Sequence, residues 1–477
     1  MTVALENELQ SDIAKVIQIP VCNQKFSKND RIQVRRFAWV LRICSVVIIT
    51  CVIIFNLYKG VDLNDPLIVY STLMPLHALI ILFVGWFFYK NPAKGIAQND
   101  LVSVIIPVYN QKSMIEIVVN AIYCSTYTNL EVITVNDGSK DGTKEILDSL
   151  VKKHPTLKII HKANEGKRKA VAAGFYASKG SYIVLIDSDS VVDPHAIKEF
   201  MKTFDADPKA GAVVGYAKAW NSKKNFLTKC QDVWYDYAFN IHKTTESVFG
   251  SVMCCSGCLA GYRREAIANF IPYWIKARIH NSDDRDLTSY AIATPWAKTE
   301  LAPISRRMME DTANYDDAED RILTAQAIVE WKSVYVASAL VYTDVPDNVK
   351  GYFKQQKRWK KGYVRSNLFV SSFFWKKNPL MALIFYVEFM TTFTSPLIVL
   401  IVLFYEPLIL HQFWIPLIFV SGSLLTGMSH GLDCKFRDSA STTWKYKPIM
   451  NLVASFILSW LVFPAIWNFR KNEWLTR

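Results

Sequence analysis

Long apolar runs lie toward both ends of the chain, and shorter apolar segments separated by polar residues lie between them. Residues 38–57 and 67–89 form the first two runs, and residues 380–405, 408–428 and 449–467 form three more. About 20 apolar residues are enough for a helix to cross a bilayer. The pattern therefore predicts a transmembrane hairpin near the N-terminus, a water-soluble domain, and a second membrane region near the C-terminus.

Basic residues beside these runs predict their orientation. Arg35 and Arg36 precede the first run, Lys90 and Lys94 follow the second, and the loop between the two runs carries little positive charge. Because basic flanks stay on the cytoplasmic side, both ends of the hairpin are expected in the cytoplasm. The last run also has basic residues on both sides. This favours a re-entrant or interfacial hairpin broken near Pro464 over a C-terminus on the far side of the membrane.

The central region alternates between strand-like and helix-like segments. Residues 101–107, 130–135 and 182–186 are apolar enough for buried strands, and residues 114–123 and 143–153 have helical patterns. Such alternation predicts a mostly parallel sheet with helices, whose ligand binds at the carboxyl ends of the strands.

Six segments follow from these patterns. Residues 348–376 are basic and aromatic with helical spacing, which is typical of helices that lie in the membrane interface. The predicted segments are a cytoplasmic N-terminal segment (1–36), a transmembrane hairpin (37–89), a cytoplasmic α/β domain (98–347), interfacial helices (348–376), a C-terminal transmembrane region (379–469) and a cytoplasmic tail (470–477).

Composition and net charge indicate what kind of partner the protein binds. The 477 residues are 51% hydrophobic and carry a formal net charge of +13. No helix-turn-helix, zinc-finger or RNA-binding signature accompanies this charge, so we expect a lipid bilayer and no nucleic acid as partner. Cys255 and Cys258 have the spacing of a metal or redox pair. A second pair or nearby histidines would be needed for a zinc site, so reduced thiols are expected instead.

Polar residues follow each predicted strand of the central region. Tyr109 comes after the first strand, Asp137 after the second, and Asp187-Ser-Asp189 after the third. A carboxylate at a strand end can accept from uracil N3–H or bind ribose hydroxyls. In an Asp-x-Asp sequence, one side chain can face the nucleoside while the other ligates a divalent cation together with a diphosphate. We predict that Asp187 contacts the nucleotide and that Asp189 binds Mg²⁺ or Mn²⁺.

Two basic segments are further candidates for ligand binding. Lys167 and Arg168 lie in a basic loop suited to a diphosphate, or simply in a solvated run of charge. The sequence Gln355-Gln-Lys-Arg358-Trp359 combines amides, a guanidinium that can bind phosphate oxygens and an indole that can stack on a sugar. The alternative for this second segment is a basic helix held by anionic lipid.

In this order the motifs resemble those of processive family 2 glycosyltransferases, and more narrowly those of bacterial and viral hyaluronan synthases. The resemblance runs from about residue 38 to the end and includes Trp474-Leu-Thr-Arg477. It implies a GT-A-type α/β domain inserted between transmembrane helices, in a multi-pass protein of the plasma membrane with its catalytic domain in the cytoplasm. It also implies that Trp474 and Arg477 close over the nucleotide and that the membrane helices form a polymer channel. The departures are Asn136, Cys258 and Leu475, where the family usually has an acidic residue, proline and glycine.

The family pattern also implies a general base in an acidic-Asp-Arg-x-Leu-Thr sequence. Two segments match, residues 282–288 with Asp284 and residues 318–324 with Asp320. Asp320 lies 35 residues before Gln355, which is the separation of the family pattern. The spacing favours Asp320, and Asp284 stays open as the alternative.

The resemblance then implies a single inverting transfer. Asp320 would deprotonate the acceptor hydroxyl as it attacks a UDP-sugar, while the metal on Asp189 and the guanidinium of Arg358 stabilise the leaving UDP. Trp359 would stack on the terminal sugar, and only the flanking cations Lys360, Lys361 and Arg365 would be left to bind lipid.

The leading hypothesis is a hyaluronan synthase that uses UDP-GlcNAc and UDP-GlcA and exports the growing polysaccharide. Three alternatives stay open: a chitin-type homopolymer synthase using one UDP-sugar, a single-transfer enzyme that glycosylates a lipid carrier, and a non-catalytic membrane receptor.

Overall fold

Strands rich in Val and Ile form one sheet in the middle of the chain. In the computed structural model the strand order is β3-β2-β1-β4-β7-β6-β8-β5. The strands are β1 Val102–Val108, β2 Leu130–Asp137, β3 Lys158–Lys162, β4 Tyr182–Leu185, β5 Ser190–Val192, β6 Ala210–Ala219, β7 Ala260–Arg263 and β8 Lys332–Thr343. The structure describes residues 36–62, 73–268, 270–275, 283–292, 331–371, 373–439 and 441–467.

The sheet is mostly parallel, as predicted. β1 pairs in parallel with β2 and β4, β2 with β3, and β6 with β8. β7 lies antiparallel between β4 and β6, and β5 pairs antiparallel with β8. The carboxyl ends of β1, β2 and β4 therefore meet at one edge of the sheet. Every residue of β1 is buried, which is typical of a parallel strand covered on both faces.

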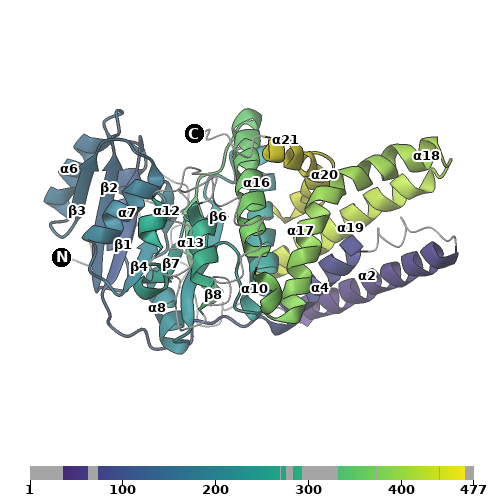
Figure 1. Ribbon diagram of the computed structural model, residues 1–477, viewed down its shortest axis with the longest axis horizontal. Coiled ribbons are helices and arrows are strands. Elements are labelled where there is room, and N and C mark those ends of the chain that lie inside the picture. The colour runs from purple at the N-terminus through teal and green to yellow at the C-terminus, as the bar shows by residue number, and fades with distance from the viewer. Residues whose placement is uncertain are drawn as a thin grey trace.

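Amphipathic helices cover the sheet (Figure 1). In α5 the buried residues Ile115, Val118, Val119 and Ile122 follow helical spacing, so one stripe of the helix packs on the core. The helices of this domain are α5 Ile115–Tyr123, α6 Thr143–Lys153, α7 Lys167–Ala177, α8 Ala196–Ala206, α11 Arg264–Ile267, α12 Ile271–Trp274 and α13 Asp283–Ile292.

A second group of helices lies between the sheet and the apolar helices. Figure 1 shows α16 crossing between the two parts of the molecule. On α10, Thr245 donates to the carbonyl of Ile81 in the apolar helix α4, at 2.7 Å. The group consists of α9 Phe226–Tyr237, the π-helix η1 Ala238–His242, α10 Lys243–Val248 and α16 Val349–Ser371, and α4 spans Leu73–Phe88.

Three helices in the described part of the chain are long and apolar enough to cross a membrane: Ala38–Asp62, Pro379–Leu408 and Trp414–Arg437. A fourth segment is bent by 44° between Trp444–Phe456 and Leu458–Trp467. The bend therefore lies at Ile457 and not at Pro464. The elements are α2 Arg36–Asp62, α17 Pro379–Leu400, η4 Ile401–Tyr405, α18 Glu406–Leu408, α19 Trp414–Arg437, α20 Lys447–Phe456, η6 Leu458–Leu461 and α21 Val462–Trp467; the short helices η3 Phe374–Lys376 and η5 Trp444–Tyr446 precede α17 and α20.

A chain of buried ion pairs joins the apolar helices to the sheet domain. Asp433 of α19 accepts from Arg42 of α2 at 2.9 Å and from Arg437 at 2.8 Å. Arg437 also forms an ion pair with Asp236 of α9, at 2.6 Å. A buried charge is tolerated when it is paired and hydrogen-bonded. These pairs explain why α19 runs on to Arg437, past the end at residue 428 predicted from hydropathy.

Candidate active site

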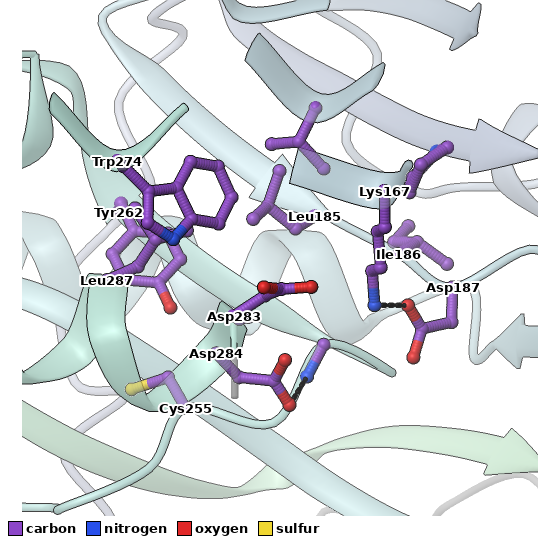
Figure 2. A pocket seen from close by; sticks show the side chains of 14 residues that line it. Lys167, Leu185, Ile186, Asp187, Cys255, Tyr262, Trp274, Asp283, Asp284 and Leu287 are labelled. Carbon is purple, nitrogen blue, oxygen red and sulfur yellow. Dashed lines mark hydrogen bonds and ion pairs between the residues drawn. The ribbon is translucent and has the colours of Figure 1, made fainter. Parts of the chain in front are cut away.

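A pocket opens where β1 and β4 end and where the helices α7 and α13 begin (Figure 2). Its lining includes Pro107 near the end of β1, Lys167 of α7, Asp187 after β4, and Asp283 and Asp284 of α13. The carboxyl edge predicted to bind ligand is thus the edge that carries this pocket.

Asp137, the last residue of β2, holds the loop that leads into α7. Its carboxylate accepts from the backbone N–H groups of Glu165 and Gly166 at 3.0 Å and 2.8 Å, and from the ammonium of Lys162 at 2.9 Å. Gly166 has a φ of +96°, a conformation that favours glycine. The loop therefore turns sharply, and α7 starts with Lys167 beside the pocket.

Lys167 and Asp187 face each other across the pocket. The Lys167 ammonium donates to Asp187 at 2.5 Å, and both side chains are about one-third exposed, at 28% and 33%. Burial alone would lower the pKa of Lys167, but the carboxylates of Asp187, Asp284 and Asp283 outweigh it and raise the pKa. The pocket consequently presents a stable ammonium at the position where a diphosphate is expected.

Asp189 lies two residues beyond Asp187 and is partly exposed. It accepts from the hydroxyl of Ser190 at 3.1 Å and weakly from that of Thr343 at 3.5 Å. Among the residues with described positions, no group of three or more His, Cys, Asp or Glu side chains is arranged to hold a metal ion. Mg²⁺ usually takes only one or two carboxylates and fills its shell with substrate phosphates and water. Asp189 therefore fits an ion that binds together with a diphosphate.

The first of the two Asp-Arg-x-Leu-Thr segments forms the start of α13 and is anchored at several points. Asp284 accepts from the backbone N–H of Gly257 at 3.0 Å and lines the pocket. Thr288 accepts from the N–H of Cys255 at 2.8 Å, and Leu287 is buried. These contacts fix the Asp284 carboxylate next to Lys167 and Asp187, as Figure 2 shows.

Arg168 holds α13 in place through two ion pairs. Its guanidinium is 1% exposed and donates to Asp283 at 2.5 Å and to Asp286 at 2.6 Å. It also lies 5.5 Å from the ring of Trp274. Two carboxylates already occupy this guanidinium, so in this structure Arg168 positions α13, whereas the sequence predicted a contact with diphosphate.

Arg365 does not face lipid, which corrects the expectation for that residue. It donates to Asp286 at 2.7 Å, and its side chain is only 14% exposed. Lys361 is buried as well. Because basic residues on one helix look alike in sequence, the partner on α13 was not foreseeable from spacing.

The Gln-x-x-Arg-Trp segment lies on α16 but does not line the pocket. Gln355 is buried, and its Oε1 has no hydrogen-bond partner in the described part of the chain. Trp359 is 37% exposed and packs near Tyr235, with ring centroids 6.2 Å apart. Tyr109, directly after β1, is partly buried. The predicted residues Asp320, Trp474 and Arg477 lie outside the described residues, and their roles stay predictions.

Sequence reasoning missed the contributions of Asp283, Asp286 and Trp274. All three contact Arg168, which sequence alone shows only as one cation in a basic loop. The repeated acidic residues before Leu287 are the feature of the sequence that points to these contacts.

Comparisons with known proteins relate the chain to glycosyltransferases. Residues 103–270 match the family model for glycosyl transferase family 2. The chain is 28% identical over 411 residues to a hyaluronan synthase of Streptococcus pyogenes, covering 83% of this chain and 88% of that protein. It is 30% identical over 269 residues to an N-acetylglucosaminyltransferase of Rhizobium meliloti, covering 55% and 56%.

Among solved structures, a mannosyltransferase of Pyrobaculum calidifontis in complex with GDP-Man and Mn²⁺ matches with a TM-score of 0.51 and 18% identity. It covers 81% of this chain and 97% of its own, and at this identity it supports the fold alone. Residues 103–270 are therefore a family 2 glycosyltransferase domain with a GT-A fold, and 83% of the chain resembles a bacterial hyaluronan synthase.

Proposed function

We propose that this protein is a processive, membrane-embedded synthase that polymerises UDP-GlcNAc and UDP-GlcA into hyaluronan by inverting transfer. The observation that carries the catalytic part is the meeting of Asp284, Lys167 and Asp187 in one pocket of a family 2 domain. The likeness to a hyaluronan synthase over 83% of the chain supports the polymer and the membrane setting.

The general base comes from one of the two Asp-Arg-x-Leu-Thr segments. Asp284 has a carboxylate held in the pocket by the N–H of Gly257, which favours it on geometry. Asp320 has the spacing of the family pattern relative to Gln355. We propose Asp284 as the base that accepts the proton of the acceptor hydroxyl, and we keep Asp320 as the rival to be tested.

The donor nucleotide would lie along the carboxyl edge of the sheet. Tyr109 and Asp187 would contact the nucleoside, with Asp137 holding the loop that places Lys167 at the diphosphate. Mg²⁺ or Mn²⁺ held by Asp189 would supply positive charge for the leaving UDP. Trp474 and Arg477 would close over the nucleotide from the C-terminal side.

The acceptor would reach the pocket along α16. Gln355 and Arg358 would bind it or the departing UDP, and Trp359 would stack on its terminal sugar. The long apolar helices would surround the polymer in a multi-pass plasma-membrane protein whose catalytic domain lies in the cytoplasm.

One experiment tests the proposal. Purified full-length protein is incubated with Mn²⁺ and with each UDP-sugar alone and both together, and the product is treated with hyaluronidase. Polymer that forms only with both sugars and is degraded supports the proposal.

Other products would favour the alternatives. Polymer from UDP-GlcNAc alone would overturn the hyaluronan assignment in favour of a chitin-type synthase, a candidate that the N-acetylglucosaminyltransferase relatives also support. A short, lipid-extractable product would point to transfer to a lipid carrier.

A further inference from the structure

Two cations lie close to one aromatic ring, that of Tyr363 on α16. The guanidinium of Arg285 lies 5.0 Å from the centroid of the Tyr363 ring, and the ammonium of Lys360 lies 5.4 Å from the same centroid. The Tyr363 hydroxyl in turn accepts from Thr392 of α17, at 3.4 Å. The cluster of Arg285, Lys360 and Tyr363 thus lies where α13, α16 and an apolar helix meet.

Neither cation forms an ion pair with a carboxylate among the described residues, and the nearby charge of Glu388 on α17 acts on Lys360 only electrostatically. Within the ranges that the structure describes, no carboxylate oxygen lies within 4 Å of Arg285 or Lys360. Arg285 has only a weak contact with the amide oxygen of Asn367, at 3.4 Å. By contrast, Arg365 on the same helix has Asp286 as its partner. Both side chains are partly buried. Because withdrawing a cation from water without a counter-ion is unfavourable, this pair is suited to an anion that arrives from outside.

Nearby groups leave the cluster positive overall. Burial lowers the pKa of Lys360, Glu388 of α17 opposes this effect, and Arg285 adds to it. Burial and the charge of Glu388 raise the pKa of Glu246 to about 7, so near neutral pH this group is only partly ionised. Lys243 adds a third cation, which bonds to the carbonyl of Cys254 and the hydroxyl of Ser256.

The position of the cluster relates it to the acceptor. Arg285 directly follows the proposed base Asp284, and Lys360 directly follows the proposed stacking residue Trp359. An acceptor chain that leaves the base along α16 would therefore come within one helical turn of both cations. The sugar that is being extended would lie at the base, and sugars further along the acceptor chain would lie at this cluster.

We propose that Arg285 and Lys360 bind the carboxylate of a uronic acid within the acceptor chain, with Tyr363 holding the two cations in place. A guanidinium pairs with a carboxylate through two parallel hydrogen bonds, and the ammonium adds a third charged contact. A neutral homopolymer leaves both cations unpaired, so the cluster selects an acidic acceptor. This inference rests on the proposed function and specifies its acceptor class.

Binding of defined oligosaccharides to the full-length protein tests the inference. Calorimetric titration compares hyaluronan tetrasaccharide with the neutral chitotetraose, for the wild type and for Lys360→Gln. We expect the wild type to bind the acidic tetrasaccharide at least tenfold more tightly. Lys360→Gln should weaken acidic binding by about tenfold, the equivalent of about 1.4 kcal/mol, and leave neutral binding unchanged.

Three variants serve as controls. Lys350→Gln changes an exposed lysine at the start of the same helix and should alter neither affinity. Lys360→Arg keeps the charge and should keep the acidic preference. Glu388→Gln removes a nearby negative charge and should strengthen acidic binding.

Two results would overturn the inference: equal binding of both oligosaccharides by the wild type, or an equal loss of both affinities in Lys360→Gln, which would indicate a packing role. Polymer formation from UDP-sugars is recorded on the same preparation. If the wild type makes polymer but shows no acidic preference, this inference fails alone. If no donor is turned over, the proposed function fails with it.

Discussion

Arg437 donates to both carboxylate oxygens of Asp236, at 3.1 Å and 2.6 Å, and so connects the apolar helix α19 with α9 of the catalytic domain. Asp236 also accepts from the hydroxyl of Tyr216 on β6, at 2.8 Å. One carboxylate thereby links an apolar helix to the central sheet. Helix α9 also carries Tyr235, which packs against Trp359, so the helix held by this ion pair also contacts the proposed acceptor segment.

Arg437→Gln should destabilise the protein strongly. Burial by itself raises the pKa of Asp236, but Arg437 and the hydrogen bonds from its neighbours hold that pKa at about 2. Removing one partner leaves a buried charge uncompensated, which typically costs about 3–5 kcal/mol. Thermal unfolding in detergent measures the loss, and the double variant Asp236→Asn/Arg437→Gln should recover part of it. An unchanged Tm in Arg437→Gln would show that water reaches this pair.

Asp284→Asn should abolish polymer formation, whereas Asp320→Asn should leave most of it. A positioned general base contributes about 10²–10⁴-fold to turnover, so the loss in kcat should be at least a hundredfold. UDP binding, measured by calorimetry, should change in neither variant. The opposite ranking of the two variants would show that the distance to Gln355 identifies the base better than the pocket does.

Much of the fold follows from local patterns, but the contacts of the site do not. Strands β1, β2 and β4 are continuous apolar runs, and the polar residues after them lie at one edge because parallel strands share their direction. The end of α19 was predicted too early because hydropathy counts Asp433 and Arg437 as polar. In the structure they are paired with each other and with Arg42 and Asp236.

The partners of Arg168 and Arg365 show why the rest of the site was not predictable. Both arginines bind Asp286, which is 118 residues from one and 79 from the other. Sequence gives the charge of each residue but not which distant carboxylate meets it. Local sequence could not separate the two candidate base segments for the same reason. Their sequences are nearly identical, and which one reaches the pocket depends on the fold.

Lys167→Met should weaken UDP binding by about 10–100-fold, because a hydrogen bond to a charged group contributes about 1.5–3 kcal/mol. The matched control is Lys169→Met, which removes an exposed cation on the same helix that pairs with Glu165. Calorimetric titration with UDP and Mn²⁺ gives both affinities. Equal affinities for the two variants would show that Lys167 serves Asp187 and not the diphosphate.

Asp189→Asn should weaken the dependence of UDP binding on metal. An amide oxygen is a poorer ligand for Mg²⁺ or Mn²⁺ than a carboxylate, so adding Mn²⁺ should improve UDP affinity in the wild type and much less in the variant. Addition of EDTA should lower wild-type UDP affinity to the level of the variant. If Mn²⁺ improves binding equally in both proteins, the ion lies elsewhere.

Glu246→Gln should remove a pH dependence of stability between about pH 4.5 and 7. Burial and the nearby charge of Glu388 raise the pKa of Glu246 from 4.5 to about 7, so in this range the folded protein holds a proton that the unfolded chain has released. Stability conferred by the protonated group therefore falls as pH rises, and it is lost above about pH 7. The variant should be more stable than the wild type at pH 8, by an amount on the order of 1–3 kcal/mol, with little difference at pH 4.5. Thermal unfolding of both proteins across this range measures the effect. Parallel pH profiles would show that Glu246 is ionised in the folded protein and that its charge is balanced by Lys243 and Arg285.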